Sequence, residues 1–204
     1  IEVPGAEDCP AAVFVKYAVV MFDDLAVLTN PGAAERKPEV AGVAEAISGL
    51  GLESVRISGE GTLDGGDVLK VGRTAYVGLG GRTNGAGIQQ LADHVRDRGW
   101  TVQAVTVERA LHLKSAVTAL PDETVIGWDP VVDWPGAFPR YEGMPEEGGA
   151  HVVILGEGHL LMAASAPRTA ELLRGRGYTV TTTDISEFEK LEGCVTCLSV
   201  RVRA

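Results

Sequence analysis

The stretch Arg98-Gly99-Trp100-Thr101-Val102 recurs further along the chain as Arg176-Gly177-Tyr178-Thr179-Val180. In both places apolar residues at helical spacing precede the Arg-Gly pair, and a strand-like pattern follows it. Glycine directly after the last apolar turn is typical of a helix end, so each stretch predicts a helix that passes into a strand. Two predicted strands precede each helix. The chain therefore repeats one ββαβ unit.

Three complete copies of this unit can be assigned. In the middle copy, Asn84 is the expected N-cap of the helix and Gly99 lies just past its end. The predicted strands and helices of the three copies lie at 13–20, 26–29, 40–47 and 53–57; at 67–71, 74–79, 84–98 and 100–105; and at 151–155, 159–163, 166–175 and 178–183.

The spacing of the copies predicts a ring. The second and third complete copies start 84 residues apart, twice a period of 42, and residues 113–119 and 124–127 begin a degenerate copy between them. One more period leads to the apolar run 194–202, which predicts the first strand of a fifth unit. Residues 1–3 match the closing strand of such a unit. Pairing of the two ends would close the ring and remove exposed sheet edges. We therefore expect one α/β domain over residues 1–204, truncated at its N-terminus.

Composition limits the classes of function. The chain has 204 residues, of which 45% are hydrophobic, and a formal net charge of −10. This length and apolar content suit one soluble domain. The net negative charge argues against nucleic-acid binding, which requires clustered Lys and Arg side chains. No apolar run reaches the roughly 18 residues of a membrane span. An odd number of cysteines, three, favours a reducing, cytoplasmic setting. A small molecule is the expected partner.

Three motifs offer an acid, an imidazole and a thiol. Asp64 lies in a Gly-rich stretch at 63–68, His112 in the segment 111–115, and Cys197 in the segment 193–197. Cys, His and carboxylate groups from distant segments can form a nucleophilic catalytic site. The spacing of Cys194 and Cys197 alone also allows a buried core pair or half of a zinc site.

The segments 61–68, 77–79, 82–84, 111–115 and 196–200 together resemble the dimethylarginine dimethylaminohydrolase family of the pentein superfamily, over essentially the whole chain. Lys114 favours the dimethylaminohydrolases within the superfamily, because amidinotransferases and deiminases usually have an acid at this position. The resemblance implies a pseudo-fivefold α/β propeller. It also implies hydrolysis of N-methylated arginines to citrulline and methylamines through a covalent thiouronium, without metal or organic cofactor. A role in arginine metabolism and nitric oxide regulation, and a homodimer, are further expectations.

The resemblance also implies roles for individual residues. Cys197 would be the nucleophile, His112 the general acid and base, and Asp64 the group that orients His112. Two arginines would hold the α-carboxylate of the substrate, and two acidic residues would complete the substrate-binding set, Asp67 from a supporting position. These four residues are Arg36, Arg82, Asp67 and Glu192.

Three positions depart from the family pattern. Ala11, Lys16 and Tyr17 stand where the family has carboxylates that hold the guanidinium. Each lost charge-assisted hydrogen bond is worth roughly 1.5 to 3 kcal/mol. A predicted strand would place Lys16 and Tyr17 on opposite faces. The alternatives are an active dimethylaminohydrolase altered at these positions, a hydrolase or transferase for a non-guanidinium substrate, and an inactive binding protein.

Overall fold

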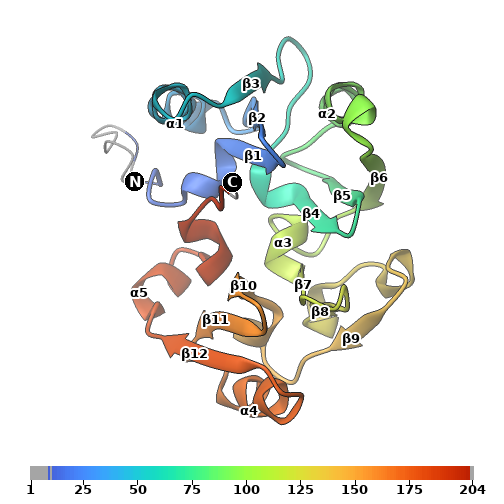
Figure 1. The fold of residues 1–204 in the computed structure, drawn as a ribbon, viewed down its shortest axis with the longest axis vertical. Helices are drawn as coiled ribbons and strands as arrows, with labels where there is room; N and C mark the ends of the chain where they lie inside the picture. Colours follow the sequence, from blue (N-terminus) through green and yellow to red (C-terminus); the bar gives the residue numbers. More distant parts are fainter. Residues whose placement is uncertain (1–8, 10, 203–204) are drawn as a thin grey trace.

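The computed structural model describes residue 9 and residues 11–202, and it arranges four small sheets around a central axis (Figure 1). Each sheet has three strands, of which the first two are antiparallel and the last two parallel. The strands are β1 Val19–Phe22, β2 Leu25–Leu28 and β3 Glu53–Arg56; β4 Val68–Val71, β5 Thr74–Leu79 and β6 Thr101–Thr106; β7 Val117–Ala119, β8 Val125–Gly127 and β9 Tyr141–Gly143; and β10 Val152–Gly156, β11 His159–Ala163 and β12 Thr179–Thr183.

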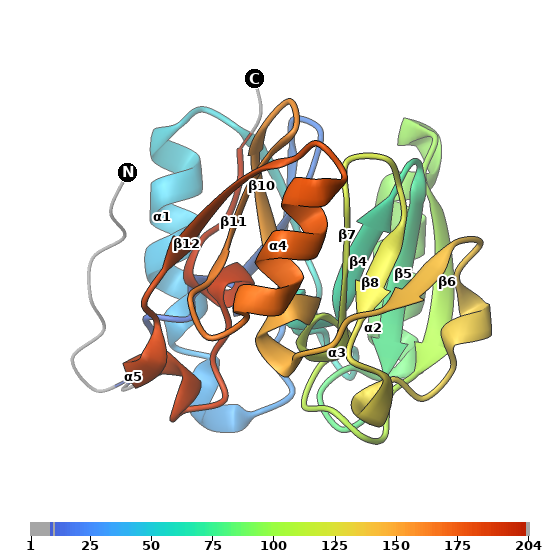
Figure 2. The same cartoon turned by 90° about the horizontal axis from the view of Figure 1, so that it is seen from below.

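Three helices connect the second and third strands of their units and lie on the outside of the ring (Figures 1 and 2). They are α1 Glu39–Gly49, α2 Gly85–Val95 and α4 Pro167–Gly175. The Asn84 side chain caps α2 by accepting a hydrogen bond from Gly87 N at 2.9 Å. Gly99 ends the following 3-10 turn at φ 76°, a left-handed conformation that favours glycine. The ββαβ repeat and the cap are thus confirmed.

The degenerate unit has no helix between β8 and β9. Two 3-10 turns, η5 Asp129–Val131 and η6 Pro135–Ala137, make the connection instead. Pro130 is the second residue of η5 and Pro135 the first residue of η6, positions at which a helix does not need the missing N–H. This substitution explains why the helical pattern could not be found there in the sequence.

The predicted beginnings of three strands were wrong. Part of the stretch 13–20 forms the 3-10 turn η1 Val15–Tyr17, part of 113–119 forms the short helix α3 Leu113–Ala116, and part of 194–202 forms the turn η8 Val195–Leu198. Each of these turns opens a unit near the axis, as η3 Gly65–Asp67 and η7 Glu147–Ala150 do in the other two. A short buried turn and a short buried strand are both apolar runs, so periodicity cannot separate them.

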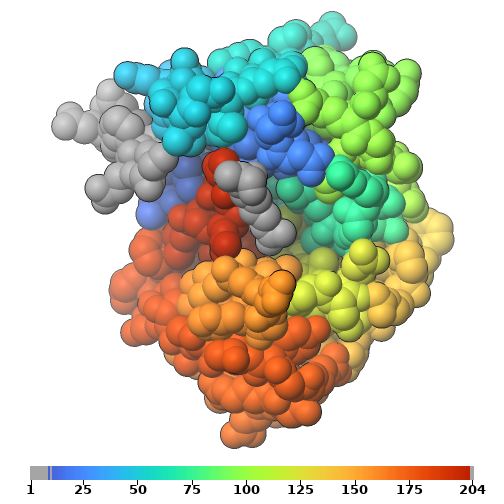
Figure 3. All heavy atoms as spheres, viewed as in Figure 1, coloured from blue at the N-terminus to red at the C-terminus, as the bar shows by residue number. Residues whose placement is uncertain are grey.

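The predicted strand 194–202 is not a strand in the part of the chain that the structure describes. The segment after η8 is instead held by Arg201, whose Nη1 donates to Ile154 O at 2.6 Å and whose Nη2 donates to Leu155 O at 3.3 Å. The C-terminal segment thereby lies between the N-terminal unit and the β10–β12 unit (Figure 3). The expected closing strand at 1–3 lies outside the described residues.

The core is divided between the units. One cluster joins the first and second units around Phe22, Leu63 and Leu91, and others fill the third and fourth units. Buried side chains of α4, such as Leu173, pack against β11. This division leaves the five short turns near the axis to carry polar side chains. Among the described residues, the helices are all too short or too polar to cross a membrane.

Candidate active site

Asp64 and His112 form a buried pair near the axis. Asp64 Oδ2 lies 2.9 Å from His112 Nε2, and the two residues are 0% and 2% exposed. Asp64 Oδ1 accepts a hydrogen bond from Gly32 N at 2.9 Å, which fixes the carboxylate. An ionised carboxylate only accepts hydrogen bonds, so Nε2 carries the proton and Nδ1 is the nitrogen that can take one up.

Glycines allow this close packing. A Cβ at Gly66 would lie 2.8 Å from Cγ of His112, and a Cβ at Gly32 would collide with the Arg82 carbonyl oxygen. The Gly-rich stretch 63–68 therefore allows the contact between η3 and the imidazole.

Asp67 supports the site from behind. It accepts hydrogen bonds from Thr83 Oγ1 at 2.6 Å and from Leu113 N at 3.0 Å, and it is 3% exposed. Burial raises the pKa of Asp67 to about 6, against the opposing effects of the His112 charge and of these two hydrogen bonds. Asp67 thus fixes the segment that follows His112 and does not reach the surface of the site.

Cys197 has Cys194 as its neighbour. Their sulfur atoms lie 3.2 Å apart, and Cys194 Sγ also lies 3.2 Å from Thr196 Oγ1. The thiol-thiolate hydrogen bond lowers the pKa of Cys194, with help from His151, and raises the pKa of Cys197. A second negative charge at this distance is unfavourable, so the pair loses its two protons in separate steps.

Tyr17 lies against His112 and within the electrostatic influence of Cys197. The Tyr17 ring meets the His112 ring edge to face at a centroid distance of 4.7 Å. Burial raises the pKa of the Tyr17 hydroxyl, and nearby negative charge on Cys197 and Asp64 raises it further. Tyr17 is only 8% exposed, so its ring fills space next to the imidazole.

The two arginines differ in their surroundings. Arg36 is 8% exposed, its guanidinium lies 3.7 Å from the Tyr17 ring centroid, and its Nη2 donates to Glu39 at 2.5 Å. Arg36 Nε is buried without a hydrogen-bond partner among the described residues. Arg82 is half-buried, and its charge lowers the pKa of Tyr17. Both arginines therefore lie near Tyr17, and Arg36 is the more buried of the two.

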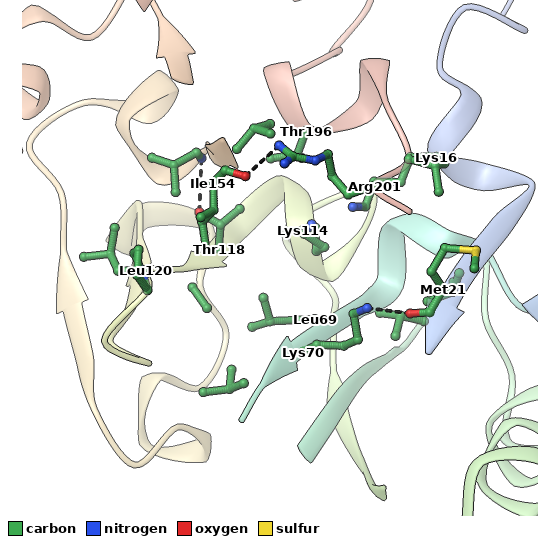
Figure 4. A pocket seen from close by; sticks show the side chains of 18 of the residues that line it. Lys16, Met21, Leu69, Lys70, Lys114, Thr118, Leu120, Ile154, Thr196 and Arg201 are labelled. Atoms are coloured by element: carbon green, nitrogen blue, oxygen red, sulfur yellow. Dashed lines mark hydrogen bonds between the residues drawn. The ribbon is translucent and has the colours of Figure 1, made fainter. Parts of the chain in front are cut away.

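Residues 15–17 form the helical turn η1 and not the predicted strand, but Lys16 and Tyr17 still point in different directions. Tyr17 faces His112, whereas Lys16 lines a separate axial cavity of about 850 Å³ together with Lys114 and Thr196 (Figure 4). Burial lowers the pKa of Lys114 well below its ordinary range, and the neighbouring Lys16 lowers it further. The Ala11 carbonyl oxygen, 3.0 Å from Arg36 Nη2, accepts a hydrogen bond.

Glu192 lies apart from this group. It is exposed, has φ 58°, and lines a second cavity of about 760 Å³ with Cys194 and His151. None of Asp64, His112 and Cys197 belongs to the described walls of either cavity. No group of three His, Cys, Asp or Glu residues suited to a metal occurs within residues 9 and 11–202.

Sequence reasoning missed several contacts of this site. Thr83 bridges Asp67 and the backbone N–H of Asp64, and Lys114 faces Lys16. Thr83 belongs to the segment 82–84, for which the sequence predicted no role of the threonine. Spacing from the next helix could place it near Asp64, but no pattern in the sequence identifies the atoms that it bonds.

Comparisons with known proteins agree with this arrangement. A family model for arginine deiminase matches residues 36–161. The chain is 60% identical to the N(G),N(G)-dimethylarginine dimethylaminohydrolase of Streptomyces coelicolor over 203 residues, covering 100% of the chain and 79% of that relative. It is 32% identical to the enzyme of the same name from Pseudomonas aeruginosa, over 97% of the chain and 79% of the relative.

Solved structures give the same family. A Cys-to-Ser mutant of the Pseudomonas aeruginosa enzyme in complex with citrulline has a TM-score of 0.88 and 31% identity, and the match covers 96% of this chain and 78% of that one. An adduct of a dimethylarginine dimethylaminohydrolase His-to-Gly mutant with S-methyl-L-thiocitrulline matches at the same TM-score, with 30% identity and the same coverage. The chain, with its pentein α/β propeller fold, therefore belongs to the arginine deiminase family and, within it, to the dimethylarginine dimethylaminohydrolases.

Proposed function

We propose that the protein hydrolyses the guanidino group of N-methylated arginines, giving citrulline and a methylamine. The observation that carries the proposal is the buried pair of Asp64 and His112, 2.9 Å apart, with the Tyr17 ring against the imidazole and Cys197 near enough for its charge to raise the pKa of the Tyr17 hydroxyl. The dimethylarginine dimethylaminohydrolase names of the relatives favour this substrate over the non-guanidinium and inactive alternatives.

Cys197 acts as the nucleophile. When the proton of the thiol pair lies on Cys194, the Cys197 sulfur attacks the guanidino carbon and forms a C–S bond. His112 holds at Nδ1 the proton that the thiol pair has lost, and it gives that proton to the departing methylamine as the C–N bond breaks, so that a covalent thiouronium remains.

His112 also serves the second half of the reaction. Its Nδ1 takes a proton from water, the water oxygen attacks the thiouronium carbon, and the C–S bond breaks. Citrulline leaves and the thiol is restored. Asp64 stays ionised and keeps the Nε2 proton in place throughout.

The arginines are proposed to hold the α-carboxylate of the substrate. Arg36 Nε is a buried donor without a partner among the described residues, and such a donor costs about 1 to 3 kcal/mol when left unpaired. A carboxylate bound there would remove that cost. Arg82, half-buried near Tyr17, is the second donor of a bidentate clamp.

The test is citrulline release from asymmetric dimethylarginine by the purified protein. Activity in the original sequence and its loss in Cys197→Ser and His112→Gln, with unchanged unfolding curves, is the expected result. Equal release by Cys197→Ser and the original sequence would contradict the proposed nucleophile.

The three departures from the family pattern should limit the rate. Tyr17 occupies the space beside His112, and Lys16 adds a positive charge near Lys114. Changing Ala11→Asp, Lys16→Glu and Tyr17→Asp together should raise kcat/KM for dimethylarginine by at least about tenfold, because each charge-assisted hydrogen bond adds roughly 1.5 to 3 kcal/mol. A rate that the triple change leaves the same would show that these positions do not limit guanidinium binding.

Several finer expectations stay predictions. We propose that Asp67 supports the catalytic residues and that Glu192 contacts the substrate at its outer edge. Measurement of kcat and KM in the two alanine variants tests each role. We also propose a single catalytic domain and a cytoplasmic location, on the grounds of the repeat and the cysteine count, and a homodimer and a role in nitric oxide regulation, on the grounds of the family resemblance. Domain limits, solution mass, cell fractionation and methylarginine levels in cells would test them.

A further inference from the structure

Cys194 and Cys197 form a close pair of thiols on one turn. Their sulfur atoms lie 3.2 Å apart, and Cys197 N donates a hydrogen bond to Cys194 O at 2.9 Å. Such an i to i+3 turn keeps the two Cα atoms within about 7 Å. Disulfides span Cα distances of about 4.4 to 6.8 Å, so the turn can be bridged with small movements of the two side chains.

Both sulfurs can be reached by a small oxidant. Cys197 is half-buried, and Cys194 lines the 760 Å³ cavity together with His151 and Ser115. The third cysteine, Cys9, is a free buried thiol with no sulfur contact to another described cysteine.

The groups around the pair favour an ionised thiol. Thr196 Oγ1 lies 3.2 Å from Cys194 Sγ, and positive charge on His151 and Lys114 also stabilises the Cys194 thiolate. Lys16 stabilises negative charge on Cys197. A thiolate with a second thiol in contact is the arrangement of a peroxide-sensitive dithiol.

We propose that Cys194 and Cys197 form a reversible disulfide when the protein meets hydrogen peroxide. In the first step a thiolate attacks the peroxide, an S–O bond forms, the O–O bond breaks, and hydroxide leaves as water after protonation. In the second step the other sulfur attacks the sulfenic sulfur, an S–S bond forms, and the sulfenic oxygen leaves as water. Two thiols are oxidised by two electrons and one peroxide is reduced to two waters.

This modification rests on the proposed function only for its effect on activity. With Cys197 as the nucleophile, the disulfide removes the free thiolate and stops turnover. The disulfide also protects Cys197 from oxidation to sulfinic acid, which most cells cannot reverse. A dithiol reductant would restore both thiols by exchange.

The experiment treats the reduced protein with a small excess of hydrogen peroxide, blocks remaining thiols with iodoacetamide, and measures the tryptic peptide 191–201 by mass spectrometry. The peptide should lose two hydrogens and take up no iodoacetamide in the original sequence. Citrulline release should fall by at least about tenfold and return with dithiothreitol. Cys194→Ser should instead gain two or three oxygens on Cys197, as sulfinic or sulfonic acid, and recover little activity. Cys9→Ser should behave as the original sequence does.

Oxygen addition without the loss of two hydrogens in the original sequence, or full recovery of Cys194→Ser by dithiothreitol, would overturn the proposal. The peptide mass is independent of turnover. A disulfide in a protein that releases no citrulline would therefore contradict the proposed function alone, and citrulline release without a disulfide would contradict this inference alone.

Discussion

The hydrogen bond between Asp64 and His112 decides which imidazole nitrogen can transfer protons. Asp64 is fully buried and receives a second hydrogen bond from Gly32, so the carboxylate cannot turn away. The imidazole is enclosed by Gly66 on one side and the Tyr17 ring on another. One carboxylate therefore sets both the tautomer and the orientation of the general acid and base.

Asp64→Asn tests this control. The amide has the same shape, so the fold should persist, but its oxygen can serve Gly32 while its NH₂ group faces His112. The imidazole proton would then move to Nδ1, and proton transfer would fail. We expect kcat to fall on the order of a thousandfold or more with little change in KM, measured by citrulline release. A rise in KM with unchanged kcat would assign Asp64 to substrate binding instead.

Asp67 gives a prediction for stability against pH. Its pKa is raised from 3.8 to about 6 in the folded protein, so the folded state binds its proton more tightly than the unfolded chain. Stability from this group is therefore present below about pH 4 and is lost as pH rises through 6. Asp67→Asn mimics the protonated form. Relative to the original sequence, its free energy of unfolding should improve by about 3 kcal/mol between pH 4 and pH 7.

Urea unfolding at several pH values measures this difference. The comparison isolates Asp67 because the other titrating groups are present in both proteins. A difference between the two free energies that stays constant from pH 4 to pH 7 would mean that the carboxyl titrates normally.

At the scale of elements, the repeat in the sequence located the strands and long helices but not the short turns. Apolar spacing predicted α2 with its cap and its glycine end, because an 11-residue helix supplies several matching positions. The turns η1 and η8 have 3 and 4 residues, too few for a helical period to show. The positions of Lys16, Tyr17 and Cys197 depend on these turns, so their contacts could not be predicted from strand alternation.

The glycines of η3 give a test of the contact between elements. A Cβ at Gly66 would lie 2.8 Å from His112 Cγ, and the buried imidazole has no room to move. Gly66→Ala should cost about 1 to 3 kcal/mol in unfolding free energy and should reduce kcat by at least about tenfold. Thermal unfolding and citrulline release measure the two effects.

Gly85→Ala is the matched control. Gly85 begins α2, and a Cβ there would meet no atom within 4 Å, so alanine should leave activity unchanged and stability equal or slightly higher. Similar losses in both variants would point to a general cost of replacing glycine and against a specific contact with His112.

At the scale of the whole molecule, the axial cavity joins all five units. Its walls include β1, β4, β7 and β10 and the segment after η8, and Lys16 from η1 faces Lys114 from α3 (Figure 4). Two like charges at the centre of the ring oppose the packing of the units around it. Burial and the neighbouring Lys16 lower the pKa of Lys114, so a positive charge on Lys114 is less favourable in the folded protein than in the unfolded chain.

Lys16→Glu should therefore stabilise the whole ring. The pKa of Lys114 is lowered in the folded protein, so between that lowered value and about 10.4 the unfolded chain binds a proton that the folded protein does not. Stability from this group consequently rises with pH in the original sequence. A glutamate at position 16 would keep Lys114 charged in both states, remove that slope, and replace repulsion by attraction worth about 1 to 3 kcal/mol in a partly exposed site. Urea unfolding from pH 6 to pH 9 should show the largest gain at pH 6.

Lys37→Glu makes the same change of net charge at an exposed position and should show no such gain. Equal effects of the two variants at every pH would attribute the change to net charge and exclude a repulsive pair at the axis.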